Sequence, residues 1–233
     1  LGQPPLSMDA RRRTGVMLQS TALTDTLKVG ELLAMTRGYY AQPLSVADYV
    51  AMAGLEGLLD RRYGKLSGGQ QRRVQFAMAI CGWPQVLFLD EPTTGLDIEA
   101  RQQMWSAIRE RAAAGCAVLL TTHYLEEAEA LADHVVVMQA GRTLAEGSVA
   151  QIRERVLQRR IRCHTQMDER DIAEWAGVRH VQRDGNVVEI QAEPVEPVVA
   201  RLLAEDPRSS ALEVHRAGLA DAFLEITRKA EAA

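Results

Sequence analysis

Short apolar runs recur along the first 150 residues and end in polar or charged residues. The clearest covers residues 86–89 and leads into two adjacent carboxylates, and a second covers residues 117–122. Apolar runs of this length, bounded by polar residues, are typical of strands buried on both faces, as in parallel sheets. A third run at 134–138 and a short one that ends at Gln19 also predict strands.

Stretches with helical periodicity separate these runs. In residues 66–81, the apolar positions Val74, Ala77, Met78 and Cys81 recur at the i, i+3, i+4 and i+7 spacing of one helix face. Strands that alternate with helices predict an α/β fold with a parallel sheet. The other helices expected in this part are at 26–65 (broken by Gly38 and Pro43), 98–114 and 124–133.

A second unit is predicted from Ile161 onward, where the pattern becomes shorter. Ser148 and Gln151 form the capping-box start of a helix that should run to about Arg160 and connect the two units. Beyond it, Val178–Val181 and Val187–Ile190 flank a turn tripeptide, which predicts a β-hairpin. Helices are expected at 169–176, 197–205 and 219–229, and a strand at 211–215. We therefore expect domains at 1–150 and 161–233, joined by a linker helix at 151–160.

Composition narrows the choice of partners. The chain is 47% hydrophobic and 25% charged, as in ordinary globular proteins, and its net charge of −4 argues against nucleic acid as a main partner. Cys81, Cys116 and Cys163 are widely spaced and form no CxxC pair, so we expect buried reduced thiols. No apolar run approaches the roughly 20 residues that span a bilayer, so a membrane role would need a partner.

The carboxylates Asp90 and Glu91 directly follow the apolar run at 86–89. Open parallel sheets bind ligands beyond the carboxyl ends of their strands, which is where these residues emerge. Because successive strand residues point to opposite sides, the two groups can do different jobs. One can serve a hydrated Mg²⁺ ion and the other can take a proton from water. The structural alternative is a strand end that merely meets solvent.

Ser67, Gly68, Gly69 and Gln70 start the helix at 66–81. Free backbone N–H groups and the positive end of the helix dipole make this position receptive to phosphate. The glycines allow close approach of the backbone, and Ser67 adds a hydroxyl donor. By itself a Ser-Gly-Gly helix start is usually a plain turn and cap, so the following strand with its carboxylates carries the phosphate interpretation.

Three further polar residues have both a functional and a structural interpretation. Asp97 can be the N-cap of the helix at 98–114, and it can also contact a second subunit. His123, at a strand end, is either a half-buried histidine or a neutral imidazole that holds a γ-phosphate and the attacking water in register. Gln19 could orient water or a metal-bound oxygen.

A phosphate-cradling loop of the form Gly-x-x-x-x-Gly-Lys-Ser/Thr does not occur in this sequence. Its lysines are Lys28, Lys65 and Lys229, and none completes the pattern. The sequence therefore carries the candidate carboxylates and the Ser-Gly-Gly helix start of an ATPase site, but not the loop that would cradle the phosphates.

Three stretches in fixed order resemble the nucleotide-binding domain of ATP-binding-cassette (ABC) proteins: LSGGQ at 66–70, VLFLDEPTTGLD at 86–97 and TTH at 121–123. The resemblance covers roughly residues 1–150. It implies a P-loop NTPase-like α/β fold with a helical subdomain at about 26–80, incomplete at the N-terminus and followed by a small α+β domain. It also implies an ATPase that uses Mg²⁺ and works as a head-to-tail dimer on a membrane permease, at the cytoplasmic face of the cell membrane.

The resemblance assigns roles by position. Asp90 matches the Walker B aspartate that supports Mg²⁺, and Glu91 matches the catalytic glutamate. His123 matches the switch histidine, Gln19 the Q-loop glutamine and Asp97 the D-loop aspartate. In that family the signature closes over ATP held by the P-loop of the other subunit; here it comprises Leu66, Ser67, Gly68, Gly69 and Gln70.

The end of the chain, Gly218 to Thr227, is similar to the C-terminal extension of daunorubicin-resistance-type exporters, which implies export of a drug or another small molecule. The family's first strands and Walker A loop should precede Leu1, so we expect a truncated sequence that is inactive by itself.

The main alternative is a non-catalytic regulatory or dimerisation protein that lacks a P-loop of its own, although intact Glu91 and His123 argue against it. A DNA-repair or chromosome-organising ATPase would place a long coiled coil between Gln19 and Leu66, where 46 residues without sustained heptads lie. Translation-factor relatives would carry two cassettes, and one is present.

Overall fold

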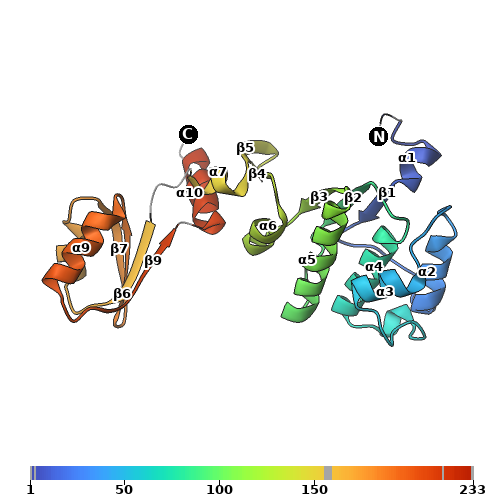
Figure 1. Ribbon diagram of the computed structural model, residues 1–233, viewed down its shortest axis with the longest axis horizontal. Coiled ribbons are helices and arrows are strands. Elements are labelled where there is room, and N and C mark those ends of the chain that lie inside the picture. Colours follow the sequence, from blue (N-terminus) through green and yellow to red (C-terminus); the bar gives the residue numbers. More distant parts are fainter. Residues whose placement is uncertain (1, 3, 155–158, 217, 232–233) are drawn as a thin grey trace. The chain divides into compact units, whose positions relative to one another are not determined.

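The computed structural model describes residues 2, 4–154, 159–216 and 218–231 of the chain. The chain forms two compact units, Leu1–Leu131 and Ala132–Ala233. Figure 1 shows the elements of both units in sequence colours.

A three-stranded parallel sheet forms the centre of the first unit. The strands β1 (Thr14–Met17), β2 (Val86–Asp90) and β3 (Ala117–Thr121) pair in that order. Met17 lies beside Leu89, and Asp90 lies beside Thr121. The predicted α/β fold with a parallel sheet is thus confirmed, and the carboxyl ends of its strands meet at one edge.

Apart from α1, which was not predicted, the helices of the first unit begin and end close to the predicted positions. They are α1 (Met8–Arg12), α2 (Val29–Arg37), α3 (Val46–Ala53), the 3₁₀ helix η1 (Tyr63–Lys65), α4 (Gly68–Ile80), α5 (Ile98–Ala113) and α6 (Leu125–Leu131). The expected helical segment 26–65 is therefore observed as two helices and a 3₁₀ turn.

One face of the parallel sheet carries the core of the first unit. Met17, Leu87 and Leu89 are buried there, together with apolar side chains of α4 and α5. Gly15 permits the close approach of β1 to α4, because a Cβ atom at this position would clash with the carbonyl oxygen of Ala79. Packing of this kind is dense enough that a single added methyl group matters.

The expectation that these strands are buried on both faces is wrong for the residues that the structure describes. Val16, Phe88 and Leu119 are 50%, 40% and 60% exposed. Val16 pairs with Phe88, and Phe88 with Leu119, so the three side chains share one face of the sheet. The described helices bury the opposite face, and no described residue covers these three enough to bury them.

The second unit begins with an antiparallel pair, β4 (Val135–Gln139) and β5 (Arg142–Gly147). The capping box starts α7 (Val149–Glu154) as predicted: the Ser148 backbone N–H donates to Gln151 Oε1 at 2.8 Å, and the Gln151 N–H donates to Ser148 Oγ at 3.2 Å. The helix α10 (Leu219–Glu231) packs on α7 and β5.

The linker helix expected at 151–160 does not reach its predicted end. Residues 155–158 lie outside the described residues, and Arg159 already begins a strand. From Ile161 to His164 buried and exposed side chains alternate, which is the period of a strand and not of a helix.

A four-stranded antiparallel sheet follows, in the order β7 (Val178–Asp184), β8 (Val187–Ala192), β6 (Arg159–His164) and β9 (Ser210–Arg216). The predicted hairpin across 184–186 is confirmed as β7 and β8. One face of this sheet forms a core with α8 (Glu169–Ala173) and α9 (Val195–Glu205), centred on Ile161 and Ile190.

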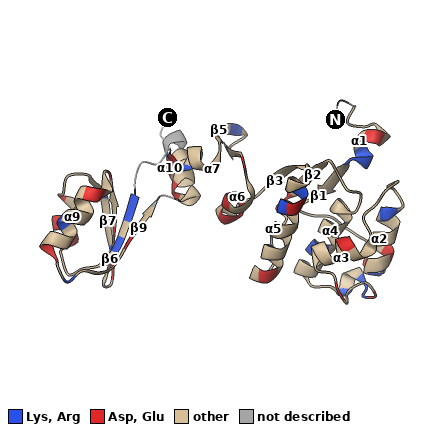
Figure 2. Cartoon of the chain, in the orientation of Figure 1, with Lys and Arg blue, Asp and Glu red and all other residues tan. Residues whose placement is uncertain are grey.

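Cys81, Cys116 and Cys163 are free and buried, as predicted. Burial raises the pKa of the Cys81 thiol to about 11, so it stays protonated at neutral pH. Basic and acidic residues are interspersed on the helices of both units (Figure 2). Within the described part of the chain, no helix has both the length and the apolar character to cross a membrane.

Candidate functional site

The carboxyl ends of the three parallel strands meet around the side chain of Asp90. Asp90 is the last residue of β2, and Thr121 is the last residue of β3 beside it. The Thr121 hydroxyl donates to Asp90 Oδ1 at 2.5 Å, and the backbone N–H of Gln19, two residues after β1, donates to Asp90 Oδ2 at 3.3 Å. These two donors fix the orientation of the carboxylate.

Glu91 follows with its backbone in the left-handed region, at a φ of 50°. This conformation is uncommon for a residue with a side chain, and such residues cluster at functional sites. The Glu91 N–H donates to the carbonyl of Thr121 at 3.0 Å. From this turn the side chain of Glu91 reaches His123.

Glu91 and His123 form a close pair. The distance from His123 Nδ1 to Glu91 Oε2 is 2.6 Å, and the Thr94 hydroxyl lies 3.4 Å from the same carboxylate oxygen. The side chain of Glu91 is 15% exposed, whereas that of His123 is 61% exposed. With Nδ1 engaged by the carboxylate, Nε2 of the exposed ring remains for a ligand.

The start of α4 has the predicted cap. Ser67 Oγ accepts from the Gln70 N–H at 3.3 Å, and Gln70 Oε1 accepts from the Ser67 N–H at 3.1 Å. The Ser67 hydroxyl proton is still free to be donated, since the cap uses Oγ as an acceptor. The side chain of Gln70 is committed to this capping box.

The two glycines of α4 have different surroundings. A Cβ atom at Gly68 would have no atom within 4 Å, so this position is open. A Cβ atom at Gly69 would lie 3.2 Å from the carbonyl oxygen of Gly95 and 3.4 Å from the side chain of Leu96. Gly68 therefore leaves room for a ligand, while Gly69 allows α4 to lie close to the Gly95–Leu96 turn.

Two other predicted residues have clear structural roles. Leu66 is buried in the core of the first unit. Asp97 caps α5, because its Oδ1 accepts from the Ala100 N–H at 2.8 Å. The N-cap interpretation of Asp97 is thus confirmed, and the proposed contact with a second subunit stays a prediction.

Arg72 joins the predicted site residues, although sequence reasoning gave it no role. It lies on α4, is 8% exposed and donates hydrogen bonds to the segments that carry Gln19, Asp90 and Glu91. Burial lowers the pKa of its guanidinium, an effect that the nearby Asp90 carboxylate opposes. The sequence shows a Gln-Gln-Arg-Arg run here, but not which arginine turns inward.

Thr121 is the second residue that was missed. A signal was present, because the strands at 86–90 and 117–121 both end in polar residues, and neighbouring parallel strands place such ends side by side. The register that puts Thr121 beside Asp90 depends on tertiary pairing.

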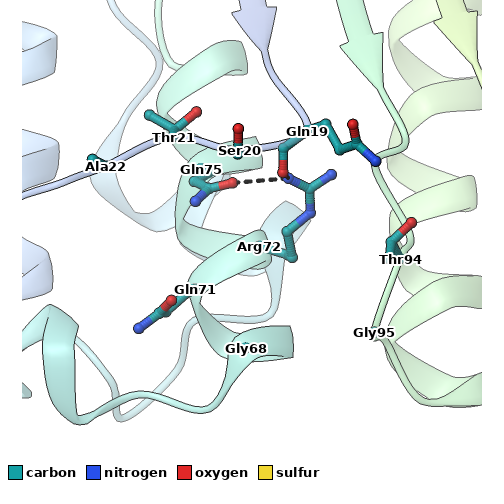
Figure 3. A pocket seen from close by; sticks show the side chains of 10 residues that line it. All are labelled: Gln19, Ser20, Thr21, Ala22, Gly68, Gln71, Arg72, Gln75, Thr94 and Gly95. Atoms are coloured by element: carbon teal, nitrogen blue, oxygen red, sulfur yellow. Dashed lines mark hydrogen bonds between the residues drawn. The ribbon is translucent and has the colours of Figure 1, made fainter.

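A cavity of about 590 Å³ links the start of α4 to the segment after β1. Gln19, Arg72 and Gln75 line one part of it, and Thr94 and Gly95 lie on the other side (Figure 3). The structure thus brings together Gln19, Asp90, Glu91 and His123 through hydrogen bonds, and Gln19 shares the cavity with Gly68.

The donor set fits Mg²⁺ bound with phosphate, but not a metal held by protein alone. Among the described residues, no group of three or more His, Cys, Asp or Glu side chains could hold a metal ion. Mg²⁺ usually keeps several waters and takes one or two carboxylates together with substrate phosphates. The oriented carboxylate of Asp90 meets that requirement.

Comparisons with known proteins agree on one family. The family model for ABC transporters matches residues 3–94. The Nod factor export ATP-binding protein I of Burkholderia orbicola is 34% identical over 243 residues, which cover 96% of this chain and 75% of that protein. The protein of the same name from Rhizobium sp. strain N33 is 41% identical over 64% of this chain and 51% of its own length.

Solved structures give the same result for the fold. The chain resembles an ATP-binding subunit of an ABC transporter with a TM-score of 0.56 and 28% identity, over 64% of each chain. It also resembles a dimeric bacterial ABC transporter cassette, with a TM-score of 0.54 and 23% identity over 60% of this chain and 65% of that one. The chain thus spans slightly less than two thirds of these solved chains, and the P-loop NTPase-like fold class is confirmed.

Proposed function

The chain belongs to the ABC transporter family, and on this basis we propose that it binds and hydrolyses ATP to drive a membrane permease that exports small molecules. The observation that carries the proposal is the hydrogen-bonded convergence of Asp90, Glu91, His123 and Gln19 at the carboxyl edge of the parallel sheet. These 233 residues contain no P-loop, so the proposal is tested on the protein as its gene encodes it.

Asp90 is the proposed support for Mg²⁺. Its two oxygens are oriented by Thr121 and by the backbone of Gln19, and each keeps a further lone pair for the ion or its waters. Bound Mg²⁺ would supply neutralisation of the charge on the phosphate oxygens. The side chain of Gln19 then senses or orients a metal-bound oxygen or the water.

Glu91 and His123 are the proposed catalytic pair. Glu91 polarises the attacking water by accepting its hydrogen bond, and His123 holds the γ-phosphate through Nε2. Phosphoryl transfer depends mainly on positioning and charge stabilisation, so the 2.6 Å contact between the two side chains is useful because it fixes both.

Ser67, Gly68 and Gly69 are proposed to close over the ATP of a second copy in a head-to-tail dimer. The free N–H groups at the start of α4, the available Ser67 proton and the open position at Gly68 all suit a phosphate. Leu66 and Gln70 shape this helix start, and Asp97, while capping α5, is proposed to contact the partner.

Export is supported by the similar proteins of Burkholderia orbicola and Rhizobium, which are named Nod factor export ATP-binding proteins. We extend this to a drug or another small molecule whose identity the permease would determine. The protein would then associate peripherally with the cytoplasmic face of the cell membrane, and nucleic acid would not be a partner.

The test compares the full gene product with its Glu91→Gln variant in an ATPase assay. Because Gln cannot accept the proton of the attacking water, kcat should fall by roughly 10²–10⁴-fold, the range for loss of a general base, while ATP affinity is retained. Glu110→Gln, at an exposed position of α5, is the matched control and should keep wild-type turnover.

Two outcomes would contradict the proposal. Near-wild-type turnover in Glu91→Gln would remove Glu91 from the chemistry. A wild-type gene product that neither binds nor hydrolyses ATP would favour the non-catalytic regulatory or dimerisation protein.

A further inference from the structure

The guanidinium of Arg72 joins two separate segments of the chain. Nη1 donates to the carbonyls of Leu18 and Gln19, each at 2.9 Å. Nη2 donates to the carbonyl of Asp90 at 3.0 Å and also to that of Glu91. One buried side chain therefore holds the backbone directly after β1 and at the end of β2.

These four carbonyls need a partner of this kind. They lie at or just beyond the ends of β1 and β2, and the guanidinium supplies a donor to each of them. Arginine presents five N–H donors in a rigid planar fork, whereas lysine presents a compact point charge. Gln75 adds to the fixation, because its Oε1 accepts from Arg72 Nη1 at 3.1 Å (Figure 3).

The hydrogen bond to Glu91 falls at the strained point of the backbone. Glu91 has a φ of 50°, and strained residues persist only where their surroundings hold them. From the same turn the Glu91 carboxylate reaches His123. Without Arg72, the backbone at Glu91 would relax more easily from its strained conformation. The Glu91 and His123 side chains would then lose their fixed geometry.

We propose that Arg72 is a positioning residue that couples the start of α4 to the Gln19, Asp90 and Glu91 backbone. The inference rests on the proposed function. In the proposed head-to-tail dimer the start of α4 contacts the ATP of the partner, while Arg72, one turn further along α4, holds the backbone that carries Gln19, Asp90 and Glu91 of its own site.

The test uses Arg72→Lys in the full gene product, with Arg73→Lys as the matched control. Arg73 is the next residue of the same helix and donates to the carbonyl of Gly54 at 2.5 Å, away from the carboxylates. Arg72→Lys should lower kcat by roughly 10- to 100-fold, the range for loss of outer-shell partners, with little change in the KM for ATP. Arg73→Lys should keep kcat.

Hydrogen exchange separates positioning from general stabilisation. In Arg72→Lys, the backbone N–H groups of Gln19 and Glu91 should exchange faster, because their segments lose the guanidinium. The amides of α5 should keep their wild-type protection. A merely structural role of Arg72 would instead speed exchange throughout the first unit.

Two further results would overturn the positioning role of Arg72. Unchanged kcat and unchanged exchange at Gln19 and Glu91, in a wild-type background that hydrolyses ATP, would overturn the positioning role and leave the proposed function intact. Arg72→Gln, whose neutral amide avoids a buried unpaired charge, serves as a second variant. If neither variant folds while Arg73→Lys does, Arg72 is a structural residue and the proposal is wrong.

Discussion

The parallel sheet of the first unit and the four-stranded antiparallel sheet of the second distribute apolar residues differently. In β2, the buried Leu87 and Leu89 alternate with Phe88, so both faces of the strand are apolar. In β6, the buried Ile161 and Cys163 alternate with arginines. The antiparallel sheet thus has one apolar and one polar face, as is common for sheets that face solvent on one side.

The two sheets also use their polar residues differently. On the polar face of the second sheet, Arg160 Nη1 lies 3.1 Å from Glu189 Oε1 on the neighbouring strand. In the parallel sheet, the polar residues gather beyond the strand ends, where Asp90 meets Thr121 and Gln19. Because parallel strands all end at one edge, they can collect chemical groups there, whereas the ends of antiparallel strands alternate between two edges.

The largest expected effect in this comparison comes from truncating one buried side chain in the core of each unit. Leu87→Ala and Ile161→Ala both remove a fully buried side chain, so each should lower the free energy of unfolding of its own unit by about 2–5 kcal/mol. Urea unfolding monitored by hydrogen exchange would assign the loss to a unit. A loss that appears equally in both units for either variant would contradict the division into separate cores.

A smaller effect is expected on the exposed face of the parallel sheet. Phe88 is 40% exposed, so Phe88→Ala should cost about 1–2 kcal/mol, less than Leu87→Ala. Arg162→Ala, on the polar face of β6, is the control from the other sheet and should stay within about 0.5 kcal/mol of wild type. A cost for Phe88→Ala equal to that of Leu87→Ala would show that this face is covered in solution.

The smallest effect is a change of pKa in the second unit. The Thr165 hydroxyl donates to Asp206 Oδ2 at 2.6 Å, and this hydrogen bond is the main cause of the lowered pKa of Asp206. Thr165→Val should raise the pKa of Asp206 toward its ordinary value, and Thr165→Ser should not. An NMR titration of the Asp206 carboxyl would measure both variants.

The sign of the associated stability change follows from the lowered pKa. Since the pKa of Asp206 is lower in the folded than in the unfolded chain, its contribution is present above the unfolded pKa and is lost as the pH falls through the folded pKa. In Thr165→Val, the free energy of unfolding of the second unit should therefore fall less steeply as the pH is lowered. An unchanged Asp206 titration in that variant would contradict the assigned role of the hydroxyl.

Local chemistry allowed much of the fold to be predicted. The apolar run at 86–89, the capping box at Ser148 and the N-cap at Asp97 all appear in the structure at the expected positions. These features depend on side chains within about four residues of each other, so the sequence contains everything that they require. The hairpin across 184–186 belongs to the same class.

The sequence by itself thus determined most of the element types, the parallel pairing of the strands at 86–90 and 117–121, and the choice of Asp90, Glu91 and His123 as candidates, because each follows from short-range pattern. Only the tertiary structure decided that Arg72 turns inward to four carbonyls, that Thr121 lies beside Asp90, and that Phe88 remains half exposed. Those outcomes depend on contacts between residues that are far apart in the chain, and they are set by strand register and packing, which no local window of sequence contains.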